Sequence, residues 1–145
     1  MPEPLTDEPD LHLLIDRQRV NGAIRPNGVY EFRLPRAPAD VHIMSRSGVP
    51  QILKISHDRR RLGVAVQRIV VWGGRRLRVM DANDPALSDG FHGFEADHGY
   101  RWTDGNATLP ASLFDGLSGA CTIEVTVGCT ARYPLAIQSS RRRAA

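Results

Sequence analysis

LGVAVQRIVVWGGRRLRVM, residues 62–80, carries the clearest hairpin signal in the chain. Valine and isoleucine dominate the part before the two glycines, and arginine is interspersed with leucine and valine after them. β-Branched residues are enriched in strands, and Gly73-Gly74 supplies the positive φ that a two-residue hairpin turn demands. The stretch therefore predicts a β-hairpin that turns at Gly73-Gly74.

Toward the N-terminus, short apolar runs alternate with turn residues in the same way. Residues 11–15 and 19–24 flank DRQ, which predicts a tight turn between two strands. PNG at residues 26–28 is a strong turn signal before the alternating run VYEFRL at residues 29–34. DVHIMSR continues the alternation, so this half of the chain is predicted to consist of strands.

Toward the C-terminus, residues 122–127 and 130–137 predict a second hairpin with its bend at Gly128. Helical turns are predicted only near residue 85, in DPALSD, and at residues 110–117, where a proline starts the segment. Both helical segments are too short for the crossover of a parallel sheet.

Strands without long crossover helices between them favour antiparallel pairing. We therefore predict an all-β fold, an antiparallel β-sandwich or jelly-roll with one or two short helical turns. Residues 1–10 are predicted to be a disordered lead-in, residues 11–138 a single β-sandwich domain, and residues 139–145 a basic disordered tail.

Charge is distributed unevenly along the chain. Residues 11–80 carry 14 bases and 4 acids, whereas residues 81–140 carry 2 bases and 8 acids. The net charge of +3 equals the contribution of Arg141, Arg142 and Arg143, so the body is neutral, which argues against a dedicated nucleic-acid binder. The two oppositely charged regions are compatible with pairing between faces, either within the chain or in a homo-oligomer.

No run of the sequence approaches the roughly 18 apolar residues that a membrane span requires. The N-terminus is acidic and rich in proline, unlike a secretory leader. We therefore expect a soluble chain, cytoplasmic or exported as part of a larger protein. Cys121 and Cys129 lie on one β-branched run and are expected to be reduced.

The strand pattern is interrupted between residues 81 and 106, and a loop of that length is often functional. Four of the chain's nine aromatic residues fall within residues 91–102, beside several acids and amides. Aromatic faces next to such oxygen atoms suit a sugar ring, whose C–H groups lie on the π surface while polar side chains bind its hydroxyls. The predicted ligand-binding residues are Phe91, His92, Glu95, Tyr100, Arg101, Trp102, Asp104 and Asn106.

Two other interpretations of this stretch stand beside the first. Large aromatic residues are usually buried, so Phe91, Phe94 and Trp102 could instead anchor the loop against the core and leave only Tyr100 and the acids at the surface. His92, Glu95 and His98 suggest a metal-dependent hydrolase, but the two histidines are six residues apart across glycines and do not have helical zinc-protease spacing. No complete catalytic motif occurs, so we predict no catalytic residue, no metal site and no cofactor.

Five motifs carry a resemblance to a known type of region: SRSGVP (45–50), RRLGVAVQRIVV (60–71), LSDGFHGFE (87–95), YRWTDGNATLP (100–110) and ARYPL (131–135). Together they resemble a β-rich accessory region of bacterial multi-domain proteins. That region follows hedgehog/intein-type (Hint) domains or accompanies glycosyltransferases and polysaccharide-related enzymes. The nucleophile and the Thr/His block of a Hint domain do not occur here, so the resemblance implies an appended module without self-splicing activity.

We therefore expect a non-catalytic accessory module that recognises carbohydrate or another surface polymer through the aromatic and acidic stretch. The alternatives are a module for protein interaction or homo-oligomeric assembly and, third, the small metal-dependent hydrolase.

Overall fold

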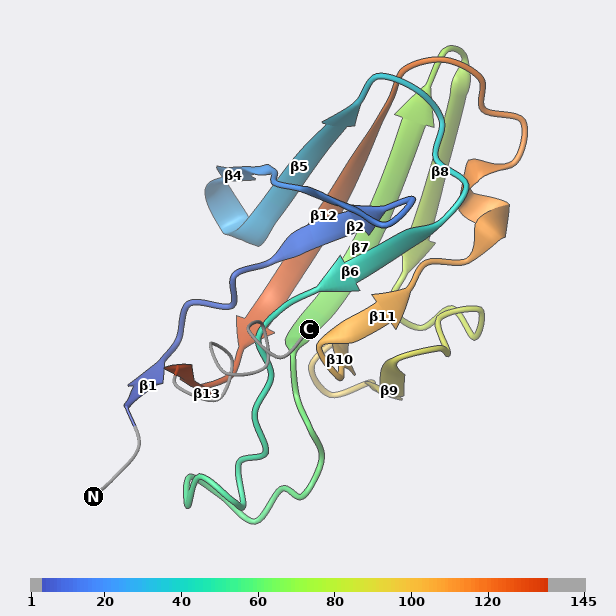
Figure 1. The fold of residues 1–145 in the computed structure, drawn as a ribbon. Coiled ribbons are helices and arrows are strands. Elements are labelled where there is room, and N and C mark those ends of the chain that lie inside the picture. Colours follow the sequence, from blue (N-terminus) through green and yellow to red (C-terminus); the bar gives the residue numbers. More distant parts are fainter. Residues whose placement is uncertain (1–3, 136–145) are drawn as a thin grey trace.

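The structure is a computed structural model that describes residues 4–135 of the chain (Figure 1). It is all-β and consists of antiparallel sheets arranged as a sandwich, as the sequence predicts. The strands are β1 (Leu5–Thr6), β2 (His12–Ile15), β3 (Gln18–Val20), β4 (Ala23–Arg25), β5 (Val29–Leu34), β6 (Val41–Met44), β7 (Val64–Gly73), β8 (Arg76–Asp81), β9 (Phe91–Glu95), β10 (Tyr100–Thr103), β11 (Asn106–Thr108), β12 (Cys121–Thr130) and β13 (Tyr133–Pro134).

The larger sheet has seven strands in the order β4-β5-β12-β7-β10-β9, with β8 also pairing with β7. The smaller sheet has four strands in the order β11-β6-β2-β3 and crosses one face of the larger sheet (Figure 1). The core lies between them, where the fully buried Leu13 and Ile43 of the smaller sheet belong to one cluster with Phe32, Ile69 and Ile123 of the larger sheet. Burying alternate residues of each strand is what the period-two pattern of the sequence dictates.

The β7–β8 hairpin is confirmed, but its turn lies one residue later than predicted. Gly73 pairs with Arg76, so the two turn residues are Gly74 and Arg75. Gly74 has φ +58° and supplies the left-handed conformation. Gly73 remains in the strand, where a Cβ would approach the carbonyl oxygen of Ala120 to 2.8 Å.

The predicted C-terminal hairpin is wrong. Residues 121–130 form the single strand β12, which passes straight through Gly128 and is central in the larger sheet. β12 pairs with β5 on one side and β7 on the other. β13 does not return along β12 but pairs with β1 at Leu5–Thr6, so this part of the predicted lead-in is an ordered strand. The predicted tail at residues 139–145 lies outside the described residues.

The predicted strand-free loop at residues 81–106 is also wrong in its second half. β9 and β10 form a hairpin at the edge of the larger sheet, and β11 begins at Asn106 in the smaller one. Of the two predicted helical segments, Ala111–Phe114 forms a 3₁₀ turn, whereas the segment near residue 85 contains turns only. A second 3₁₀ turn, Pro26–Gly28, occupies the predicted PNG turn. Within residues 4–135 no helix has the length and apolar character needed to cross a bilayer.

Candidate functional site

The β9–β10 hairpin positions the side chains of the aromatic and acidic stretch. Glu95 pairs with Tyr100 and Phe94 pairs with Arg101 across the two strands. Paired residues share a face and neighbouring residues alternate. Phe94 and Arg101 therefore occupy one face of the hairpin, and Glu95 and Tyr100 the other. The turn between the strands is closed by the N–H groups of His98 and Gly99, which both donate to the carbonyl oxygen of Glu95.

A groove with a volume of about 440 Å³ lies beside the hairpin, at the point where β10 and β8, which both pair with β7, separate from each other. β7 pairs with β10 at Ala65 and Val66 but with β8 from Arg68 onward, so Gln67 is at the fork. The groove is lined by Gln67, Arg68, Asp81, Ala82, Asn83, Phe94, Gly99 and Thr126.

The fork is produced by irregular register in the larger sheet. Between β7 and β12 the register shifts on both sides of Val127, which leaves Gln67 and Gly128 as extra residues. Such bulges bend a strand and redirect its side chains. A Cβ at Gly128 would lie 2.6 Å from the side-chain nitrogen of Gln67, so the glycine is what lets the Gln67 amide lie against β12.

The groove presents one aromatic ring among polar groups. Phe94 is 37% exposed, and the Nε of Arg68 donates to Oδ1 of Asp81 over 2.8 Å in an ion pair whose side chains are both 56% exposed. The amides of Gln67 and Asn83 provide both donors and acceptors. Ring, amides and ion pair together place an apolar surface beside hydrogen-bond donors and acceptors in the groove.

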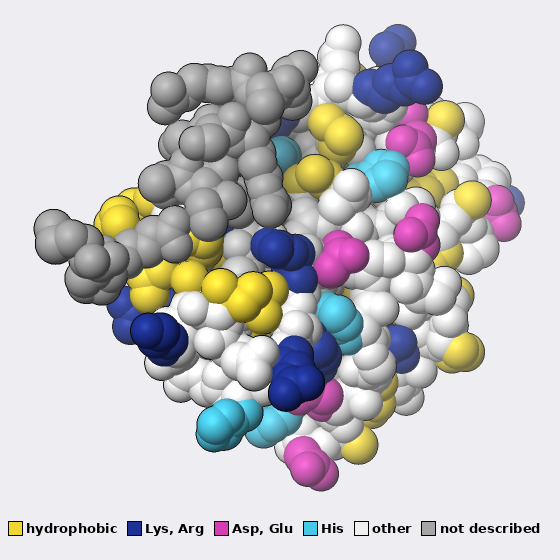
Figure 2. Space-filling model, turned by 60° about the horizontal axis from the view of Figure 1, so that its bottom comes forward, with side chains coloured by type: hydrophobic (Ala, Val, Ile, Leu, Met, Phe, Trp, Pro, Cys, Tyr) yellow, Lys and Arg dark blue, Asp and Glu magenta, His cyan; other side chains and the backbone are white. Residues whose placement is uncertain are grey.

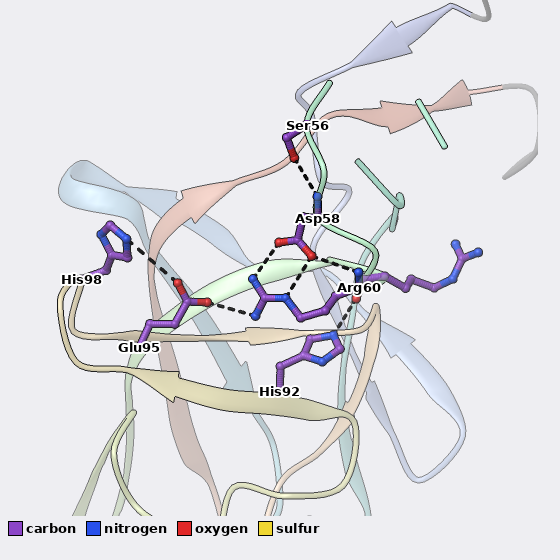
Figure 3. A network of polar contacts seen from close by, with 7 residues as sticks. Ser56, Asp58, Arg60, His92, Glu95 and His98 are labelled. Carbon is purple, nitrogen blue, oxygen red and sulfur yellow. Dashed lines mark hydrogen bonds and ion pairs between the residues drawn. The ribbon is translucent and has the colours of Figure 1, made fainter. Parts of the chain in front are cut away.

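A polar network occupies the other side of the hairpin (Figure 3). The Arg60 guanidinium donates to Oδ2 of Asp58 over 2.8 Å and to Oε2 of Glu95 over 3.1 Å. His98 Nε2 lies 4.0 Å from Oε1 of Glu95, and the N–H of Asp58 donates to the hydroxyl of Ser56. Arg60 thus joins the loop before β7 to the β9–β10 hairpin. Its two carboxylate partners fix the orientation of the guanidinium.

The contacts of the network shift the pKa values of its ionisable groups. The hydrogen bond from Arg60 lowers the pKa of the Asp58 carboxyl, and the same bond raises the pKa of the Arg60 guanidinium. Both groups are therefore charged at neutral pH. The pKa of the Tyr100 phenol is raised, chiefly by burial and then by the nearby Cys129 and Glu95, so this hydroxyl is a hydrogen-bond donor rather than an anion.

The rings of this face are packed against one another rather than free. The imidazole of His98 stacks on Tyr100 at a centroid distance of 4.9 Å, and the rings of Tyr100 and Trp102 form a T-shaped pair at a centroid distance of 5.8 Å. Trp102 is only 6% exposed and forms a small cluster with Leu62 and Ala65. The prediction that Trp102 offers its face to a ligand is wrong, because the indole is packed in this second core.

The other predicted ligand residues do not converge on one site. Phe91 packs against the main core. Arg101 donates from Nε to the carbonyl oxygen of Ala82 and from one terminal nitrogen to that of Leu87, so it fastens the segment between β8 and β9. His92 Nε2 lies 2.7 Å from the carbonyl oxygen of Arg61, away from His98.

The last two predicted residues belong to the connection between the sheets. The Asp104 carboxylate accepts from the N–H of Asn106, and Asn106 Oδ1 lies 2.9 Å from Nδ1 of His42 on β6. Across residues 4–135 no cluster of three His, Cys, Asp or Glu residues has the geometry to hold a metal ion. Cys121 and Cys129 are free.

Sequence reasoning missed the groove residues on β7 and β8. It also placed Phe94 among the possible buried anchors, whereas its ring is 37% exposed and lines the groove. One signal was present: Gln67-Arg68 places two polar residues in succession within a valine-rich strand and breaks its alternation. Such a break is typical of a bulge. Its closeness to Phe94 and Asn83 could not be derived from the pattern, because those residues are distant in sequence.

Comparison of the chain with protein-family models, curated proteins and solved structures gives no match.

Proposed function

We propose that the protein is a non-catalytic accessory module that binds carbohydrate in the groove beside the β9–β10 hairpin. The observation that carries this proposal is the exposed ring of Phe94 among the side chains of Gln67, Arg68, Asp81 and Asn83. The expected occupant is one or a few sugar rings of a longer polymer, because the groove is open to solvent along the sheet.

Each component has a chemical role. The face of Phe94 carries partial negative charge and attracts the C–H groups of a pyranose ring. Amides and the Arg68–Asp81 pair donate to and accept from adjacent hydroxyls. Because the pair is exposed, it remains solvated and adds specificity rather than much affinity. We therefore expect dissociation constants between micromolar and millimolar, about −8 to −4 kcal/mol.

Isothermal titration calorimetry against neutral and acidic polysaccharides tests the proposal. Phe94→Ala is expected to weaken binding about tenfold, since ring stacking contributes on the order of 1 kcal/mol beyond area burial. Asn83→Ala should weaken it severalfold through the lost hydroxyl contacts. Val79→Ala is the matched control, because Val79 is 53% exposed but lies on β8 away from the groove.

Equal affinity of the Phe94→Ala and Val79→Ala proteins for every bound polysaccharide would remove this groove from consideration. Trp102→Ala is not a suitable probe of binding because its side chain is buried.

A second candidate function is homo-oligomeric assembly through the outer face of the β7–β8 hairpin. The pairs Trp72–Leu77 and Val70–Val79 place four apolar side chains on the face opposite the core. Leu77 is 67% exposed and Val79 53% exposed. Contiguous exposed apolar surface is typical of an interaction site. Analytical ultracentrifugation tests this candidate: a concentration-dependent dimer that Leu77→Ser with Val79→Ser abolishes supports it, and a monomer at all concentrations refutes it.

A further inference from the structure

The loop between β6 and β7 displays two isoleucines at the end of the molecule. Ile52 is 71% exposed and Ile55 is 47% exposed, although both are large and aliphatic. Neither belongs to the core or to the small cluster around Trp102. Figure 1 shows this loop projecting beyond the ends of the strands. We refer to residues 51–61 of this projecting loop as the tip.

The loop is held in shape by its own backbone. The N–H of Gln51 donates to the carbonyl oxygen of Asp58 over 2.8 Å, which closes the loop, and the N–H of Ile55 donates to that of Pro50 over 2.9 Å. Leu53 is half-buried and lies near Gly48, so it anchors the loop from inside. Lys54, between Leu53 and Ile55, has φ +60°, a conformation that is uncommon for a residue with a side chain.

These contacts explain why the isoleucines point outward. Of the five aliphatic residues between β6 and β7, Leu62 is buried and Val49 and Leu53 are half-buried. The two isoleucines are exposed to solvent. An ordered loop that exposes aliphatic side chains loses little further backbone entropy when they are buried by a partner.

Basic residues lie close to the two isoleucines in the sequence of the loop. Residues 51–61 contain Lys54 and three arginines at 59–61 but only one acid, Asp58. Asp58 is neutralised by Arg60, whereas Lys54 and Arg59 are exposed. On this end of the molecule hydrophobic side chains lie beside those of Lys and Arg, and Asp and Glu side chains also occur on the same face (Figure 2). Within the loop itself the bases outnumber the acid, so we expect a partner that covers the isoleucines to carry negative charge.

We propose that this tip docks on an anionic lipid bilayer, with Ile52 and Ile55 inserted at the boundary between headgroups and acyl chains. Lys54 and Arg59 then contact the headgroup phosphates, and Leu53 keeps the loop in place. Apolar side chains inserted at that depth, together with cations near the surface, are the two contributions that hold a peripheral protein on a membrane.

A bilayer fits the tip better than an acidic protein does. Anchors at protein interfaces are mostly Trp, Tyr and Arg seated in pockets, whereas this loop offers branched aliphatic groups on a projection. A bilayer needs no complementary pocket. The proposal goes beyond carbohydrate binding, since no residue of the groove belongs to the loop.

Co-sedimentation with vesicles tests the proposal. The whole chain is mixed with vesicles of phosphatidylcholine alone, or with about 30% phosphatidylserine, at about 0.1 M salt. Binding is expected only to the anionic vesicles. Ile52→Ser with Ile55→Ser should weaken it at least tenfold, because each isoleucine contributes roughly a factor of ten when it is buried. Lys54→Gln with Arg59→Gln should weaken it several-fold.

Ile24→Ser is the matched control, since Ile24 is an isoleucine 70% exposed on β4, outside the loop, and this variant should bind as the parent does. Arg141, Arg142 and Arg143 are also attracted to anionic lipid, so the isoleucine pair, not salt dependence, identifies the loop. As a direct readout, Ile52→Trp should show a blue shift and quenching by brominated acyl chains.

Absence of binding to anionic vesicles overturns the proposal. So does binding that the isoleucine substitutions leave unchanged, or an Ile52→Trp emission that brominated lipid does not quench. An acidic protein captured by the parent in the absence of lipid affinity would likewise assign the tip to another class of partner. Each of these outcomes leaves carbohydrate binding by the groove untouched.

Discussion

Replacing Tyr133 with phenylalanine removes a buried hydroxyl that joins β13 to the start of β7. The hydroxyl donates to the carbonyl oxygen of Gly63 over 2.6 Å and accepts from the N–H of Ala131 over 3.0 Å. Tyr133 is 0% exposed and its bond to Gly63 is buried, so water cannot replace that bond in the variant. Each unpaired group costs about 1–3 kcal/mol, and the cost is at the lower end for the part-buried Ala131 N–H, so we expect a loss of about 2–4 kcal/mol in the free energy of unfolding.

The same hydroxyl makes this difference depend on pH. Burial raises the pKa of Tyr133 to about 12, whereas the unfolded phenol titrates near its ordinary value of 10.0. Below pH 10 the phenol is neutral in both states, and the stabilisation is fully present. Above it only the unfolded state ionises, so stability is lost as the pH rises toward 12. Two pKa units correspond to about 3 kcal/mol.

The phenylalanine side chain of the variant cannot ionise, so the variant does not share this loss. The gap between the parent and the Tyr133→Phe protein should therefore be about 2–4 kcal/mol at about pH 8 and close to zero at about pH 12. The pKa values of Tyr30 and Tyr100 are also raised. These two residues are present in both proteins, so their contributions to the pH dependence cancel in the difference between the unfolding free energies.

Urea unfolding at both pH values measures the gap from the shift in midpoint at constant m-value. Tyr30→Phe is the control, because its ring is only half-buried and its removal should cost less. Equal midpoints at about pH 8, or a gap of the same size at both pH values, would refute the reasoning.

Three further predictions concern the hairpin and the loop. Trp102→Ala should lower the free energy of unfolding by about 3–5 kcal/mol, because the indole is buried; a change of melting temperature within a degree or so would contradict that packing. Thr103→Val should cost about 2 kcal/mol in urea unfolding, since its buried hydroxyl accepts from two backbone N–H groups, while Thr103→Ser should remain close to the parent. The hydrogen bond from Arg60 lowers the pKa of the Asp58 carboxyl, so the stabilisation from this contact is fully present above the ordinary pKa and is lost as the pH falls through the lowered one. Chemical shifts of the Asp58 and Arg60 amides in NMR should follow this titration in the parent and not in Asp58→Asn.

The local pattern predicted the strands well where it was strongest. The valine-rich run and the glycine pair of residues 62–80 specify a hairpin by themselves, because strand alternation and positive φ at a turn are properties of neighbouring residues. The turn position was displaced by one residue because both glycines are compatible with it, and only the pairing of Gly73 with Arg76 decides between them.

Pairing between distant strands was not predictable in the same way. Gly128 looks like a bend, yet it is an extra residue in the central strand β12, because β5 and β7 pair with that strand on both sides. The stretch 91–103 shows little β-branched character, yet it forms a hairpin because β10 pairs with the buried start of β7. In each case the neighbour that stabilises the strand lies far away in sequence.

Composition and short-range order were sufficient to predict the all-β class and the uneven distribution of charge along the chain. Which aromatic rings are buried and which are exposed depended on the packing of distant strands. Trp102 is packed and Phe94 is exposed because their hairpin places alternate residues on opposite faces, and only one of those faces meets the second core. Exposure is a property of what covers a side chain, and that cover is supplied by strands remote in the chain.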